Sequence, residues 1–209
     1  MKKIIAGVIG ALVVVGAGAG LWIFLDSSAA AASVGKVKIS ATQVDGTVKA
    51  IIAERKTVST TGMQLAVGPA LNAEALNFYI ISTLLAQTAA ANNVAVTEAQ
   101  VKTRSAAILT QQGSAAKLKL GEVSSSIASK DFPGYVREIL YVEGLTALVE
   151  KQGTAAANSS TAVQDLVRQL AIKAGVKVNA KYGTWDATQV TVVPPGTASS
   201  STPTPAPTK

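Results

Sequence analysis

Residues 69–93, PALNAEALNFYIISTLLAQTAAANN, decide the fold of this chain. Pro69 is a favourable first residue for a helix, and the apolar spacing predicts that this helix continues to about Asn93. Its large apolar side chains point in nearly every direction around the helix axis: Leu76, Phe78, Tyr79, Ile80, Ile81, Leu84 and Leu85. A helix that is apolar on all sides is either the central helix of a domain or lines an open groove. The sequence alone does not decide between these two positions.

The segments on both sides of this helix predict further helices. Three residues have a glutamine three positions later, which is the spacing of a helix-capping box: Ser40, Thr97 and Thr161. Apolar residues spaced at three and four indicate another helix over residues 131–151, which Gly153 should end. Residues 154–160 are small and polar and are predicted to be a linker.

Short strands are predicted at both ends of the helical region. Residues 34–39 alternate between apolar residues and lysine, the pattern of a strand. Near the other end, Val176 and Val178 alternate with polar residues, and residues 182–192 suggest a turn between two extended pieces. We therefore expect a mainly α domain over residues 33–194, closed by short N- and C-terminal β-strands.

The N-terminus predicts a membrane segment. Lys2 and Lys3 precede an uncharged apolar stretch over residues 4–25, which at about 1.5 Å per residue is long enough to cross a hydrocarbon core about 30 Å thick. Residues 1–32 are either a retained signal anchor or a signal peptide cleaved at Ala29–Ala32. In both cases the rest of the chain is expected outside the cytoplasm, facing outward from the cell membrane or secreted.

Two further features concern the ends of the chain. Residues 195–209 are rich in proline, serine and threonine and are predicted to be a disordered tail, because they cannot bury enough surface to offset their chain entropy. Gly16 and Gly20 have a spacing that can bring two transmembrane helices together, which would give a homo-oligomer. The alternative is that both glycines are simply tolerated in a signal segment.

Composition excludes several classes of function. The chain has no cysteine and no histidine, which removes disulfides, the usual zinc sites and histidine-dependent catalysis. The formal net charge is +7, but the basic residues are scattered and aromatic residues are only 4%, which argues against nucleic acid as a partner. We expect no enzyme activity, no cofactor and no metal.

Several stretches carry a family resemblance: Val34–Ser40 (VGKVKIS), Leu84–Ala89 (LLAQTA) followed by Val94–Val101 (VAVTEAQV), Val136–Leu140 (VREIL) and Val178–Asp186 (VNAKYGTWD). Together they resemble the N-terminal domain of SurA/PrsA-type extracytoplasmic chaperones, and the last stretch resembles the ending of the actinobacterial branch. The chain departs from that ending at Ala180 and Lys181, where the family has proline and arginine. It also lacks the parvulin-type prolyl isomerase domain, for which residues 154–160 leave no room.

The resemblance implies a chaperone lobe without isomerase activity, in which helices frame an apolar groove and the first and last strands pair to close it. Its partners would be unfolded or extended exported polypeptides. The candidate substrate-binding residues are Phe78, Tyr79, Ile81, Leu85, Phe132 and Tyr135, for each of which the alternative is a role in the core.

Other residues are expected to have structural roles. Trp185 is interpreted as a buried packing anchor for the closing segment. Glu138 and Glu143, or Asp186 with Lys181, are interpreted as solvated or ion-paired residues rather than acid/base pairs. Ser114 and Lys117 match the S-x-x-K pattern of serine penicillin-recognising enzymes, but the partner motifs are missing.

Two functions from different classes follow. The first is an exported, membrane-anchored chaperone that binds many unfolded chains weakly. The alternative is a structural or accessory envelope protein that binds one dedicated partner in stoichiometric amounts. The sequence does not decide between them.

The position of Lys2 and Lys3 generates a prediction about topology. Because both lysines lie on the N-terminal side of the apolar stretch, residues after Asp26 should lie outside the cytoplasm. A C-terminal fusion to a reporter that is active only in the cytoplasm should therefore be silent. Strong reporter activity would overturn the export hypothesis.

Overall fold

The computed structural model describes residues 30–196, which form six helices and five short strands. The elements are β1 (Ala30–Val34), β2 (Val37–Ser40), α1 (Ala41–Arg55), α2 (Gly68–Ala91), α3 (Glu98–Gln112), α4 (Ala115–Ser124), α5 (Phe132–Lys151), α6 (Ala156–Ala174), β3 (Lys177–Val178), β4 (Thr184–Asp186) and β5 (Thr191–Val193). The mainly α class with short strands at both ends is confirmed. The apolar stretch 4–25 and residues 197–209 lie outside the described residues. Within 30–196, no helix combines the length and the apolar character that a membrane crossing requires.

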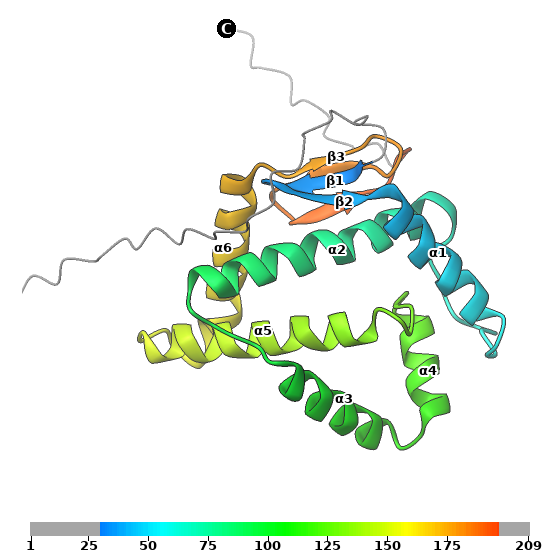
Figure 1. The fold of residues 1–209 in the computed structure, drawn as a ribbon, viewed down its shortest axis with the longest axis horizontal. Coiled ribbons are helices and arrows are strands. Elements are labelled where there is room, and N and C mark those ends of the chain that lie inside the picture. The colour runs from blue at the N-terminus through cyan, green and yellow to red at the C-terminus, as the bar shows by residue number, and fades with distance from the viewer. Residues whose placement is uncertain (1–29, 197–209) are drawn as a thin grey trace, which may run out of the picture.

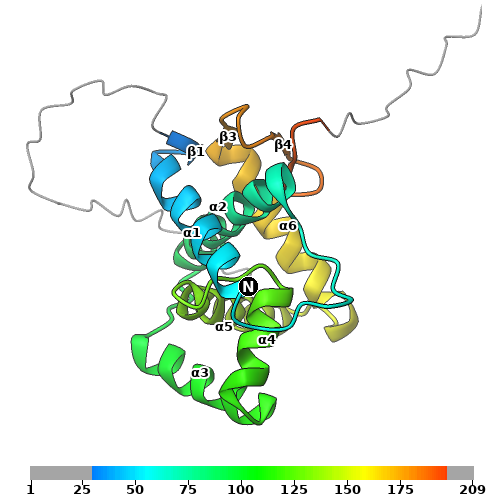
Figure 2. The same cartoon turned by 90° about the vertical axis from the view of Figure 1, so that its right-hand side faces the viewer.

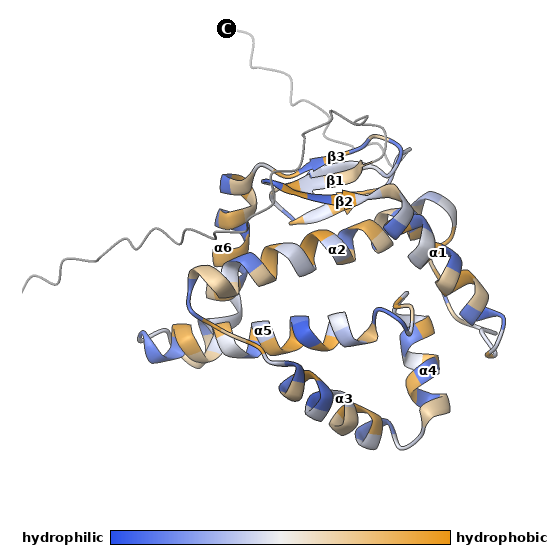
Figure 3. Cartoon of the chain, in the orientation of Figure 1, coloured by the Kyte–Doolittle hydropathy of each residue, from blue (hydrophilic) through white to orange (hydrophobic). Residues whose placement is uncertain are grey.

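Helix α2 is the centre of the domain. Figure 1 shows it between the sheet and α5, and Figure 2 shows α1 and α6 on opposite sides of it. Apolar residues occur along its whole length (Figure 3), and the side chains of Leu76, Ile80 and Leu84 are completely buried. The central position that its apolar pattern allowed is therefore confirmed.

The predicted strand over residues 34–39 is instead a hairpin. Gly35 has a φ of +59° and forms, with Lys36, the turn between β1 and β2. A positive φ at only the first central residue is the pattern of a type II′ turn, which matches the twist of paired strands. β1 is the middle strand of the order β2-β1-β3, and its residues Ala31 and Ala32 are buried. The sheet thus begins at Ala30, inside the segment assigned from sequence to the signal.

The two ends of the domain meet in this sheet. β3 pairs antiparallel with β1, with Ala32 opposite Val178, so the expected pairing between the two ends of the domain uses residues just before the predicted strand 34–39. The last strand, β5, pairs with β4 instead, and the backbone N–H of Val192 donates to Asn77 Oδ1 of α2 at 3.1 Å.

Tyr182 anchors the closing segment. Its side chain is 1% exposed, and its hydroxyl donates to Asp45 Oδ1 of α1 at 2.8 Å. Burial and this carboxylate raise the pKa of Tyr182. The ammonium of Lys181 lies 5.0 Å from the ring centroid and 3.5 Å from Asp45 Oδ2. Trp185 packs against the core, as its predicted packing role requires, but it is only partly buried, and the fully buried aromatic residue of the segment is Tyr182.

The predicted helix caps have different outcomes. Thr97 forms a complete capping box with Gln100, and Ser40 accepts a hydrogen bond from the Gln43 amide. Thr161 caps nothing, because α6 begins five residues earlier, at Ala156. Alanine has the highest helix propensity, and the alanines at 155–157 extend α6 through most of the predicted linker. Ser114 of the S-x-x-K match is the N-cap of α4, where it accepts from the Lys117 amide at 3.2 Å.

One acidic residue lies between α2 and α5 without a basic partner among the described residues. Glu138 of α5 accepts a hydrogen bond from the Ser82 hydroxyl of α2. Burial raises its pKa to about 7, against the opposing effect of the Ser82 hydrogen bond. The interpretation of Glu138 as solvated or ion-paired is therefore wrong, whereas Glu143 pairs with Arg104 at 2.6 Å.

Gly183 tests the packing of the closing segment. It has a φ of +137°, and a Cβ there would lie 2.2 Å from the carbonyl oxygen of Val193. We expect Gly183→Ala to lower the free energy of unfolding by about 2 kcal/mol or more, measured by thermal or denaturant unfolding. Gly46→Ala is the matched control: it lies inside α1 with open space around it, and it should raise stability by about 0.5–1 kcal/mol. A neutral Gly183→Ala would contradict this packing.

Glu138 should make stability depend on pH. Because its folded pKa is about 7 and its ordinary value is 4.5, the folded chain should lose stability as pH rises through that interval. Glu138→Gln removes the charge and keeps an acceptor for Ser82, so it should stabilise the chain above pH 7 by up to about 3 kcal/mol. It should bring no such gain at pH 4.5. Unfolding at both pH values, with Glu143→Gln as the control, checks this; an equal gain at both would contradict it.

Candidate functional site

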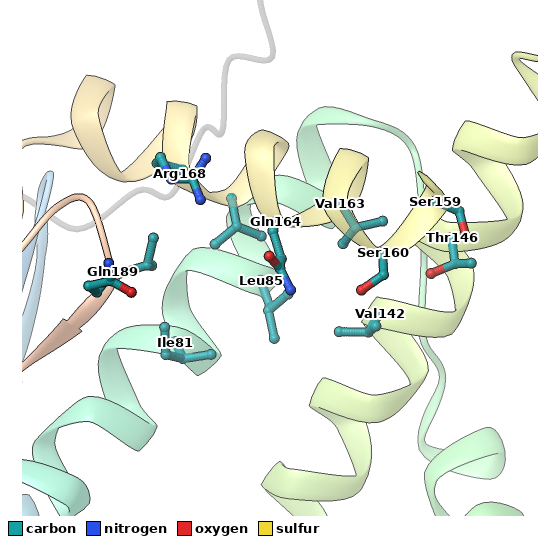
Figure 4. A pocket seen from close by; sticks show the side chains of 12 residues that line it. Ile81, Leu85, Val142, Thr146, Ser159, Ser160, Val163, Gln164, Arg168 and Gln189 are labelled. Atoms are coloured by element: carbon teal, nitrogen blue, oxygen red, sulfur yellow. The ribbon is translucent and has the colours of Figure 1, made fainter. Parts of the chain in front are cut away.

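An apolar groove lies between α2, α5 and α6 (Figure 4). Its volume is about 530 Å³, and the loop between β4 and β5 closes one end of it. The α2–α5–α6 groove, as we call it, is lined by Ile81, Leu85, Val142, Thr146, Ser159, Ser160, Val163, Gln164, Val167, Arg168, Gln189 and Val190. Figure 4 shows side chains from all three helices directed into the same space.

The floor and the rim of this groove differ in chemistry. Leu85, Val163 and Val167 are at most 7% exposed and form its floor. Val142 of α5 is 40% exposed on the rim, beside hydroxyl and amide side chains such as Thr146 and Gln164. An apolar floor with a polar rim and an exposed valine is suited to binding apolar side chains of another molecule.

Arg168 fixes the end of the groove. Its guanidinium pairs with Asp165 one turn earlier on α6, and its Nε donates to the carbonyl oxygen of Thr188 at 3.2 Å. Asp186 accepts the backbone N–H groups of Thr188 and Gln189 at 2.8 and 3.0 Å. These bonds hold the β4–β5 loop against α6, and they give Asp186 a structural role apart from Lys181.

The six candidate binding residues do not share one surface. Ile81 and Leu85 line the α2–α5–α6 groove. Phe132 and Tyr135 line a separate hollow of about 270 Å³ between α3, α4 and α5. Phe78 stacks edge-on against Tyr79, and its ring faces Gly134 of α5.

Tyr79 belongs to a polar cluster that joins three elements. Its hydroxyl donates to Asp131 Oδ1 at 3.0 Å and lies 2.6 Å from Thr47 Oγ1. Thr47, which is 2% exposed, donates to Asp131 Oδ2 at 2.7 Å, and Lys130 donates to Thr47 at 2.7 Å. Because these bonds connect α1, α2 and the start of α5, the Tyr79 hydroxyl has a structural role in addition to any contact with a ligand.

Sequence reasoning missed the contributions of α5, α6 and the β4–β5 loop to the groove. Val163 and Val167 have the helical spacing of apolar residues, which serves core packing and groove lining equally, so the sequence does not mark them as lining residues. The half-exposed Val142 gave no distinguishing signal. For metal binding, residues 30–196 contain no cluster of three or more acidic, histidine or cysteine side chains.

One of the comparisons with known proteins found a match. The family model of the SurA-like N-terminal domain matches residues 1–120, which is more than half of the chain. A search of curated proteins and a search of solved structures each found no match. The match includes the resembling stretches 34–40, 84–89 and 94–101. The stretches 136–140 and 178–186 lie beyond it. The chain therefore belongs to the family of SurA-like N-terminal domains.

Proposed function

We propose that this protein is an exported, membrane-anchored, chaperone-like protein that holds unfolded or extended polypeptides in the α2–α5–α6 groove without isomerase activity. The observation that carries the proposal is the exposed apolar rim of a groove whose floor is already buried. The SurA-like family agrees with polypeptide binding. The absence of histidine and cysteine from the sequence agrees with a role that is passive rather than catalytic.

The groove suits transient binding. Burial of apolar surface contributes about 25 cal/mol per Å², and few large apolar side chains of the groove are accessible: the exposed Val142 and the partly buried Ile81 and Val190. One or two client side chains can be covered there, which gives weak binding. A holding chaperone needs weak binding, because the client must leave in order to fold.

The position of β1 supports the retained anchor. Cleavage within Ala29–Ala32 would remove residues from the middle strand of the sheet, where Ala31 and Ala32 are buried. A signal peptidase would thereby destabilise the domain that it releases. An uncleaved N-terminus avoids this cost and favours the membrane-anchored form.

The proposal predicts that aggregation of several unrelated unfolded clients is suppressed by the full chain in detergent, with no acceleration of prolyl isomerisation. Val142→Gln should weaken client binding about fivefold to tenfold, because a valine contact of about 1 kcal/mol or more is lost. Ile172→Gln is the matched control, since Ile172 is 65% exposed on α6 and does not line the groove. Client titration by fluorescence anisotropy measures both variants.

Three results would contradict the proposal. Equal losses in the two variants would mean that binding follows general surface hydrophobicity rather than the groove. Inertness toward all unfolded clients, with tight stoichiometric binding of one envelope protein, would replace the chaperone with the accessory-protein alternative. Faster prolyl isomerisation in the presence of the chain would remove the passive mechanism.

A further inference from the structure

Strand β2 has one edge that no described strand pairs with. In the order β2-β1-β3, β2 pairs only with β1. Val34 and Val37 flank the two-residue turn and form a hydrogen-bonded pair, so the next pair, Ser33 and Lys38, is non-hydrogen-bonded. The backbone N–H and C=O of Lys38 therefore point away from β1 toward the free edge.

A second groove runs along this edge. It has a volume of about 440 Å³ and is lined by Val37, Lys38 and Ile39 of β2, Gln43 of α1, and Tyr79, Ser82, Thr83, Ala86 and Gln87 of α2. Small side chains of α2 such as Ser82 and Ala86 leave room beside the strand. Val37 is 45% exposed there. We call it the β2 edge groove.

We propose that the β2 edge groove binds an extended segment of a partner polypeptide by antiparallel strand pairing, with an acidic residue opposite Lys38 and apolar residues on both sides of it. Residues directly opposite each other share one face of a sheet, so the acidic side chain would lie beside the Lys38 ammonium. Its two neighbours would point to the other face, where Val37 and Ile39 lie, and enter the groove. This inference rests on the proposed polypeptide binding and adds a second site with its own specificity.

Charge favours an acidic segment of a partner over a second copy of this chain or the chain's own residues 197–209. The groove is lined by Lys38 and by no acidic residue, and Lys36 lies next to it in the turn. A second copy of this chain paired through β2 would bring like charges together, which disfavours edge-to-edge association. Residues 197–209 of the same chain contain no acidic residue, so they lack the charge that Lys38 would select, and the prolines at 203, 205 and 207 remove N–H groups from their second half.

A charge-reversal experiment tests the pairing. The probes are eight-residue peptides with Val-Glu-Val or Val-Lys-Val at the centre, titrated against the full chain in detergent. Lys38→Glu should weaken binding of the glutamate peptide about tenfold and strengthen binding of the lysine peptide. Lys102→Glu is the matched control, because Lys102 is exposed on α3 outside the groove, and it should leave both affinities unchanged.

Backbone methylation tests the hydrogen bonds. In the antiparallel register, the N–H of the central glutamate faces Lys38, whereas the N–H groups of the adjacent valines face away. N-methylation of the glutamate amide should abolish binding, and N-methylation of a neighbouring valine amide should not. Equal effects of the two methylations would overturn strand pairing.

The outcomes separate this site from the α2–α5–α6 groove. The Val142→Gln variant should bind the glutamate peptide with the same affinity as the unmodified chain. The Ala86→Leu variant, whose leucine fills the β2 edge groove, should bind this peptide more weakly. Peptide binding that is lost in Val142→Gln but kept in Lys38→Glu would overturn the β2 site and leave the proposed function standing. Absence of peptide binding, or self-association that Lys38→Glu alters, would also overturn it.

Discussion

Packing against α2 from several sides is the constraint on which the rest of this structure depends. A helix with apolar residues on every side must be covered on every side, and each neighbouring element covers one part of it: the sheet, α1, α5 and α6. These elements bring their own buried residues to the core, such as Val34 of β1, Leu145 of α5 and Val163 of α6. Polar contacts also help to set their positions, as in the cluster of Tyr79, Thr47 and Asp131 between α1, α2 and α5.

The same constraint explains why binding surfaces form beside α2. The neighbouring elements do not cover all of the apolar surface of α2, so hollows remain where two of these elements diverge. Ile81 faces the hollow between α5 and α6, and Ser82 and Ala86 face the one beside β2. The two grooves differ in chemistry because one wall of each is different: helix side chains in the first, a strand edge in the second.

Local patterns predicted the local features of this fold. The length of α2 and the capping box at Thr97 follow from contiguous residues, and both agree with the structure. The sequence did not predict strand β1, because the alanines at 30–32 become a strand only by pairing with β2 and with the distant β3. The cap predicted at Thr161 failed because helix propensity upstream of it prevails. The groove was predicted only in part, since an all-round apolar helix carries no signal for which side remains open. Which of its side chains face a hollow is fixed by α5 and α6.

The pairing of β1 with the closing segment has a consequence for biogenesis. The side-chain amide of Asn179 donates to the carbonyl oxygen of Ala30, 149 positions earlier in the sequence. The first strand of the domain to be synthesised therefore pairs fully only after residues near the C-terminal end have been made. During synthesis, α2 and its flanking helices leave the ribosome before their sheet can be completed. The domain passes through a stage in which its own apolar helix is uncovered. Folding therefore finishes only when nearly the whole chain has been synthesised, and until then this protein needs the same protection that unfolded chains need.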